Sequence, residues 1–126
     1  MSDPIVFVDS SEIHEGKLDD VKVLIHELAE FVETNEPRPI LYQVFLDQAG
    51  HTMTVVQIHP DSESMETHMD VARSVFSKFT GLLQMRRMDI FGKPSQALLD
   101  SMTKKAEMLG AAGVTVHDLQ AGFARP

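Results

Sequence analysis

Apolar and polar positions follow two different periods along this chain, and together they predict a mixed α+β domain. Runs in which neighbouring residues are both apolar occur over 5–8, 40–46 and 53–59, and such runs are typical of strands covered on both faces. Between and after them, apolar residues recur every three or four positions over 18–32 and 65–79, which predicts helices with one buried face each. The predicted order is strand, helix, strand, strand, helix.

The rest of the chain predicts a fourth strand and a C-terminal extension. Residues 85–91 alternate between apolar and polar positions as a strand does. A further helix and a short last strand are expected over about 95–126. No repeat or long linker interrupts this order, so we expect a single domain over 1–126 with a core over about 5–91.

The two strands of the predicted hairpin carry apolar residues on both faces, and this predicts a partner. The chain's own helices can cover one face of the sheet. With 126 residues the chain has no second layer to cover the other face. The sheet of a second copy is the simplest cover, so we expect a homodimer through sheet-to-sheet packing.

The turn of this hairpin decides which side chains share a face. If residues 48–51 form a four-residue turn, Tyr42 lies opposite Gln57, and both then share a face with His59. One residue more or less in the turn would move one strand's side chains to the other face. A cluster of these three polar residues is therefore predicted only for the four-residue turn.

The helix predicted after Pro60 carries a histidine within its apolar face. At about 100° per residue, His68 points the same way as the apolar side chains that follow it. An inward histidine can act as a general base or as a hydrogen-bond donor to a ligand. It can also be a core residue satisfied by a backbone carbonyl or a water molecule. We keep both interpretations and take His68 as the candidate catalytic residue.

Six residues around His68 are candidate ligand-binding residues. They are polar interruptions of apolar strands, or adaptable and aromatic side chains of the same helix face: Tyr42, Gln57, His59, Met65, Met69 and Phe76. A buried hydroxyl or amide needs partners, which a ligand, another strand or another subunit could supply. Methionine side chains could line a pocket or simply fill the core.

Composition and charge limit the chemistry further. A net charge of -8 offers no basic patch for nucleic acid or for an anionic membrane. The absence of cysteine excludes thiolate catalysis and Cys-based metal centres, and the histidines lack metal-ligand spacing. We expect neither a metal nor a cofactor. The run Lys104-Lys105 is predicted to be a solvated patch. Without a secretory signal or a long apolar run, the expected location is cytoplasmic.

With this order of elements, the sequence resembles the antibiotic-biosynthesis-monooxygenase-like family of the dimeric α+β barrel superfamily. The matching stretches cover roughly 5–91 and are Glu15-Gly16-Lys17, Glu36-Pro37, Leu41-Tyr42-Gln43-Val44 and Ser64-Met65-Glu66-Thr67-His68. The resemblance implies a ferredoxin-like antiparallel sheet with helices on one face, pairing with a second copy. It also implies a pocket between sheet and helices for a flat aromatic or polyketide-like molecule.

For some members, the resemblance implies oxygen insertion without metal or flavin, so we expect a cofactor-independent monooxygenase acting on a small aromatic, quinol or polyketide-like compound. The alternatives are a non-catalytic ligand-binding or structural homodimer and a haem-degrading monooxygenase. The chain has no tryptophan, against which the haem-degrading relatives distort the porphyrin. It departs from the family where Val56-Gln57-Ile58-His59 replaces a frequent aromatic strand end, and in the added residues 95–126.

Overall fold

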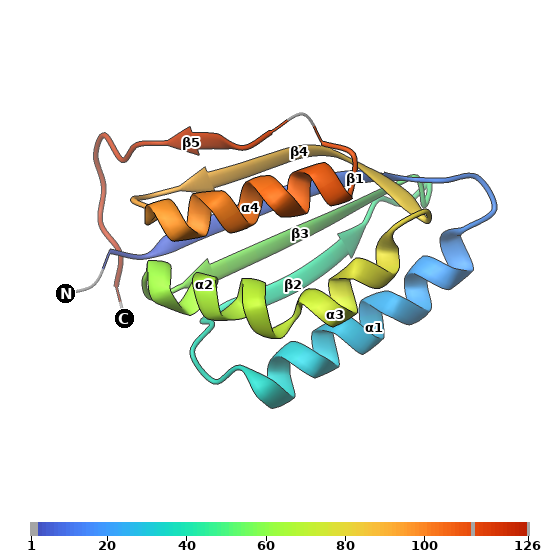
Figure 1. Cartoon of the computed structure of the whole chain (residues 1–126), viewed down its shortest axis with the longest axis horizontal. Helices are drawn as coiled ribbons and strands as arrows, with labels where there is room; N and C mark the ends of the chain where they lie inside the picture. Colours follow the sequence, from blue (N-terminus) through green and yellow to red (C-terminus); the bar gives the residue numbers. More distant parts are fainter. Residues whose placement is uncertain (1–2, 112, 126) are drawn as a thin grey trace.

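The computed structural model describes residues 3–111 and 113–125 and shows an α+β fold (Figure 1). The elements in chain order are β1 (Ile5–Ile13), α1 (Leu18–Asn35), β2 (Leu41–Leu46), β3 (Thr52–His59), α2 (Ser62–Val71), α3 (Arg73–Phe76), the 3₁₀ helix η1 (Ser77–Phe79), β4 (Leu83–Phe91), α4 (Gln96–Met108) and β5 (Thr115–His117). The predicted fold class is therefore confirmed.

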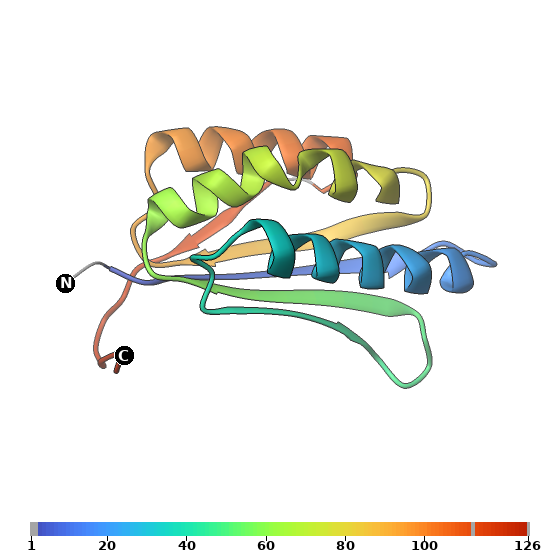
Figure 2. The ribbon, with the colours of Figure 1, turned by 90° about the horizontal axis from the view of Figure 1, so that it is seen from below.

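The strands form one sheet in the order β2-β3-β1-β4-β5. The first three pairings are antiparallel, and β5 adds to the edge of β4 in parallel. Figure 2 shows the sheet edge-on, with the helices gathered on one side of it. We call the side that faces the helices the inner face and the opposite side the outer face.

The alternation of β1 shows how the sequence separates the two faces. Ile5, Phe7, Asp9, Ser11 and Ile13 are all buried, whereas the residues between them are half-buried or exposed. A strand has a side-chain period of two, so these five positions share the inner face. Each fully buried Ile or Phe of this row contributes about 1.5–3 kcal/mol to stability. The same row also carries two polar residues into the interior.

The hairpin between β2 and β3 has the predicted four-residue turn. The Asp47 N–H donates to the Thr52 carbonyl at 3.1 Å, and Gly50 takes the turn position with φ +73, which glycine adopts without strain. Tyr42 then lies directly opposite Gln57. The predicted register is confirmed, and both side chains lie on the inner face.

The second predicted helix is interrupted. Asp61 caps α2 by accepting a hydrogen bond from the Ser64 N–H at 2.9 Å. The helix ends before Ala72, whose ψ of -2 leaves the helical range, and the chain continues as α3 and η1. The prediction of one continuous helix up to Phe79 was therefore wrong. The inward direction predicted for His68 is confirmed, since its side chain is fully buried.

We expect Asp61→Ala to lower the free energy of unfolding by about 1 kcal/mol, because it removes the acceptor that caps α2. Asp61→Asn is the matched control, since its side-chain oxygen can still accept from the Ser64 N–H. Urea unfolding of both variants checks the prediction. Equal losses in the two variants would show that the cap does not stabilise α2.

Candidate functional site

A polar cluster lies between the inner face of the sheet and α2. The strand register sets Tyr42, Gln57 and Phe7 side by side across β2, β3 and β1, and His59 stands two positions beyond Gln57. The His68 ring reaches this cluster from α2, with ring centroids 5.4 Å from Tyr42 and 5.9 Å from His59. The structure thus brings together four of the residues singled out in the sequence.

Glu36 joins this cluster and holds the His68 ring. It follows α1 directly, and both of its carboxylate oxygens lie 3.0 Å from His68 Nδ1. Both side chains are almost completely buried. A carboxylate can only accept, so Nδ1 carries the proton. Burial lowers the pKa of His68, and the opposing effect of Glu36 offsets this only in part. The ring is therefore neutral, with its Nε2 lone pair free of a proton.

His59 is held in the opposite tautomer. Its Nε2 lies 2.8 Å from Gln57 Oε1 and its Nδ1 lies 2.8 Å from Ser64 Oγ. The amide oxygen can only accept, so Nε2–H donates to it and Nδ1 accepts the Ser64 hydroxyl proton. Burial, followed by the neighbouring His68, lowers the pKa of His59 from 6.5 to about 4. His59 is therefore a neutral, fully bonded group that orients Gln57.

Tyr42 stays protonated in this setting. Burial, followed by the Asp9 and Glu36 carboxylates, raises the pKa of its phenol well above the usual value of 10.0. A neutral phenol can both donate and accept a hydrogen bond. Tyr42 can therefore donate a hydrogen bond to a ligand but does not act as a base.

Four buried polar atoms have no hydrogen-bond partner among the residues that the structure describes. They are Asp9 Oδ1, Ser11 Oγ, Gln57 Nε2 and His68 Nε2; we call them the open polar atoms. All four belong to the inner face or to the helix that covers it. Folded proteins leave few such atoms, and leaving one costs about 1–3 kcal/mol. Their presence in one layer points to a site for a polar molecule.

Lys105 of α4 forms a second buried ion pair on the same layer. Its Nζ lies 3.7 Å from Asp9 Oδ2, and both side chains are nearly inaccessible. Lys104 is exposed, as predicted, but Lys105 is buried. The prediction of a solvated patch was therefore wrong for Lys105. The signal was present in the sequence, since Lys105 follows Leu98 and Met102 at the spacing of one helix face. The period of two in β1 likewise places Asp9 inward.

Two openings flank this interior. A groove of about 830 Å³ runs between the second half of α1 and the start of β2, and Glu36 and Tyr42 line it. Both residues also contact His68, so the imidazole lies directly behind this wall. We call the second opening the α4 crevice. Its volume is about 20 Å³, and it is lined by Met69, Arg73, Phe76, Ser101, Lys104, Lys105 and Met108.

The predicted ligand-binding residues therefore divide into three places. Tyr42, Gln57 and His59 lie in the polar cluster, while Met69 and Phe76 line the α4 crevice. Met65 is fully buried in the core. Over residues 3–111 and 113–125, no group of three or more His, Asp or Glu side chains could hold a metal ion. No helix in the described ranges has the length and apolar character needed to cross a membrane.

Solved structures share this fold. MupZ from Pseudomonas fluorescens is 18% identical and aligns over 98% of this chain and 95% of its own, with a TM-score of 0.74. SnoaB from Streptomyces nogalater, a cofactor-independent oxygenase, is 11% identical over 75% of this chain and 97% of its own, with a TM-score of 0.62. An antibiotic biosynthesis monooxygenase is 17% identical over 72% and 97%, with a TM-score of 0.59.

The fold is therefore that of antibiotic biosynthesis monooxygenases, as the resemblance implied. The alignment with MupZ extends over nearly the whole chain, so MupZ has counterparts to most of it, the residues beyond the 5–91 core included. No protein-family model matches the sequence, and no curated protein sequence matches it significantly.

The histidine pKa values predict how stability depends on pH. In the unfolded chain His59 takes up a proton near pH 6.5, whereas in the fold its pKa is about 4. The unfolded state therefore binds more protons between these values, and the free energy of unfolding falls as the pH is lowered through them. His59→Gln should show a smaller fall, with His68 supplying the remainder. Urea unfolding at several pH values measures both; identical slopes in the two proteins would contradict this assignment.

Proposed function

We propose that this protein binds a small phenol-, quinol- or polyketide-like compound against His68 and removes a proton from it. The resulting electron-rich anion then reacts with dioxygen, so the protein acts as a cofactor-independent monooxygenase. SnoaB, which has a similar fold, is a cofactor-independent oxygenase, and this supports the proposal of oxygen chemistry without a cofactor.

The single observation that carries the proposal is the state of the His68 ring. Glu36 fixes its Nδ1 proton, and Nε2 is one of the open polar atoms. A neutral imidazole whose second nitrogen is buried without a bonding partner, and whose first is held by a carboxylate, has the arrangement of a positioned general base. Gln57 Nε2, another open atom, supplies a donor for a carbonyl or phenol oxygen of the same ligand.

The reaction balances without a further redox partner. His68 Nε2 takes the proton of an activated C–H or O–H group, and Glu36 stabilises the imidazolium that forms. The carbanion form of the anion passes two electrons to dioxygen as a C–O bond forms, and the imidazolium returns the proton to give a hydroperoxide. Loss of water from the hydroperoxide converts a CH₂ group to a ketone. One oxygen atom enters the product and the other leaves as water.

We expect His68→Ala to lower the rate of oxygen uptake with anthrone by a factor on the order of 10² to 10⁴, the usual contribution of a general base. Glu36→Gln should lower it too, because a neutral amide stabilises the imidazolium poorly. An oxygen electrode measures both rates. His51→Ala is the matched control, since His51 is exposed in the β2–β3 turn and lines neither opening. Turnover by His68→Ala equal to that of the wild type would remove His68 from the mechanism.

The second candidate function is ligand binding without chemistry. The observation that favours it is the complete burial of His68, which is 0% exposed. A buried hydrogen bond between His68 and Glu36 can hold α2 against the rest of the core without any role in catalysis. If the wild type and His68→Ala both bind anthrone and neither takes up oxygen, the result would support ligand binding over monooxygenase activity.

We also propose that a second copy of the chain covers the outer face of the sheet. Val6, Val8, Val56 and Ile58 are half-buried on this face, and Phe45 is 50% exposed. Val8 lies opposite Val56, at the centre of an apolar area that a second sheet can cover. The isologous contact of two such faces gives a closed dimer.

We expect Val8→Lys to convert the dimer to a monomer, because it sets an ammonium group in the middle of the apolar contact. Val23→Lys is the matched control, since Val23 is 69% exposed on α1. Light scattering coupled to size-exclusion chromatography gives the mass of each. A wild-type protein that is monomeric at micromolar concentration would contradict the dimer.

A further inference from the structure

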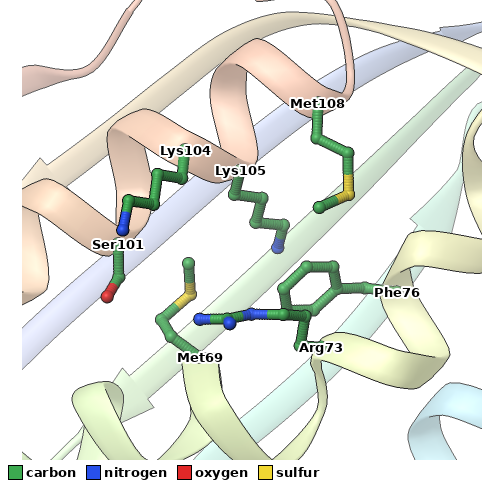
Figure 3. A pocket seen from close by; sticks show the side chains of 7 residues that line it. All are labelled: Met69, Arg73, Phe76, Ser101, Lys104, Lys105 and Met108. Atoms are coloured by element: carbon green, nitrogen blue, oxygen red, sulfur yellow. The ribbon is translucent and has the colours of Figure 1, made fainter.

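Lys105 is a charged group that the proposed proton transfer does not use. It projects from α4 into the interior and is 6% exposed. Figure 3 shows its side chain reaching toward the Phe76 ring, whereas Lys104 turns away along α4. Its Nζ lies 4.5 Å from the centroid of Phe76 and 5.4 Å from that of Phe7. Two aromatic rings thus favour a cation at this place.

Lys105 and Asp9 form an ion pair without a hydrogen bond between them. At 3.7 Å the two groups attract each other, but this separation is too long for a hydrogen bond. The other Asp9 oxygen and the Ser11 hydroxyl are open polar atoms. Asp9 therefore has a carboxylate oxygen, and Ser11 two positions further along β1 has a hydroxyl, without the partners that burial normally requires, and the Lys105 ammonium group lies beside Asp9.

This group belongs to the same layer as the His68 cluster. Phe7, whose ring lies beneath Lys105 Nζ, is directly opposite Gln57 in the sheet. Asp9 is two positions from Phe7 on the same face of β1. The positive charge of Lys105 is felt at His68, where it helps to lower the pKa of the imidazole. Lys105 lies over Phe7, and His68 lies beside Tyr42 and His59, so the two residues cover neighbouring positions of the same inner face.

Space beside Lys105 can be made by side-chain rotation. The α4 crevice has a volume of about 20 Å³, which holds roughly one water molecule. Met69 and Met108 form part of its wall, as Figure 3 shows. Methionine side chains have three rotatable bonds and adapt to a guest at low cost.

We propose that Lys105 is the anion-stabilising residue of the site, so that the ligand is a compound whose negative charge develops between His68 Nε2 and Lys105 Nζ. The proposal rests on the function proposed above and narrows its substrate class to hydroxylated aromatic or enol compounds with a second polar group. That second group is a hydroxyl, since Asp9 Oδ1 can accept its proton and Ser11 Oγ can accept or donate.

The charge balance explains why an ammonium group is needed in addition to a base. When His68 takes the proton, the imidazolium is neutralised by Glu36 at 3.0 Å. The anion left on the ligand then has no counter-charge from this pair. Lys105, whose own charge is balanced by Asp9 at 3.7 Å, supplies an ammonium donor to this anion in a region where water is excluded and charge interactions are strong.

The test uses two probes, so that the base and the cation are examined separately. The first probe, 4-nitrobenzoate, is already an anion and needs no base. We expect Lys105→Met to bind it about tenfold more weakly than the wild type, the value of one charge-assisted hydrogen bond. Lys105→Arg should retain the affinity, and His51→Ala, at an exposed residue of the β2–β3 turn, should leave it unchanged. Equal affinity for Lys105→Met and the wild type, or no binding by the wild type, would overturn the role of Lys105.

The second probe, 4-nitrophenol, reports ionisation through the absorbance of its phenolate. At a pH below the pKa of the free phenol, we expect the wild type to bind it as the phenolate, and both Lys105→Met and His68→Ala to lose that band. A band that persists in His68→Ala but is lost in Lys105→Met would overturn the proposed base and leave Lys105 in place. A phenolate band that persists in Lys105→Met would overturn the role of Lys105 but not the role of His68 as the base.

A folding control is built into the design. Lys105→Met leaves Asp9 buried without its partner, which can destabilise the fold. The double variant Asp9→Asn with Lys105→Met removes both charges and avoids this penalty. It should melt as the wild type does and bind 4-nitrobenzoate as weakly as the single variant. Wild-type affinity in the double variant would contradict the inference.

Discussion

The buried contact between Glu36 and His68 is the constraint on which the rest of the site depends. It joins the connection after α1 to the face of α2, two segments that are separated by the whole β2–β3 hairpin. Removal of one partner of such a pair typically costs about 3–5 kcal/mol, because it leaves a polar group buried without compensation. The contact also fixes the proton on Nδ1. Both the position and the basicity of His68 Nε2 follow from it.

The sheet provides the other half of the arrangement, and its period of two explains the polar layer. On β1, the row that buries Ile5 and Phe7 also buries Asp9 and Ser11. On β3, the inner row carries Gln57 and His59. The hydrogen bonds of His59 to its neighbours are complete, so the open polar atoms are not a sign of a poorly bonded core. Functional sites often carry such buried polar atoms, each of which costs about 1–3 kcal/mol unless a ligand or a water molecule bonds to it.

The sequence predicts much of this fold because local periods determine the elements. The four-residue turn set the face of Tyr42 and Gln57, and the helical period turned His68 inward. Glu36 was named only as part of the family resemblance, because it lies between a helix end and two prolines, where no period operates; its contact with His68 spans 32 positions. Lys105 was misassigned for a different reason. Its charge suggested solvent, although the period of α4 and the facing Asp9 place it in the interior.

The protonation state of His68 tests the central claim most directly. Nitrogen-15 NMR of the imidazole at pH 7, assigned by comparison with His68→Ala, reports which ring nitrogen carries a proton. We expect a neutral ring with the proton on Nδ1 and none on Nε2, and a change of the Nε2 shift when 4-nitrophenol is added. A ring protonated on Nε2, or on both nitrogens, would contradict the assignment of His68 as the base.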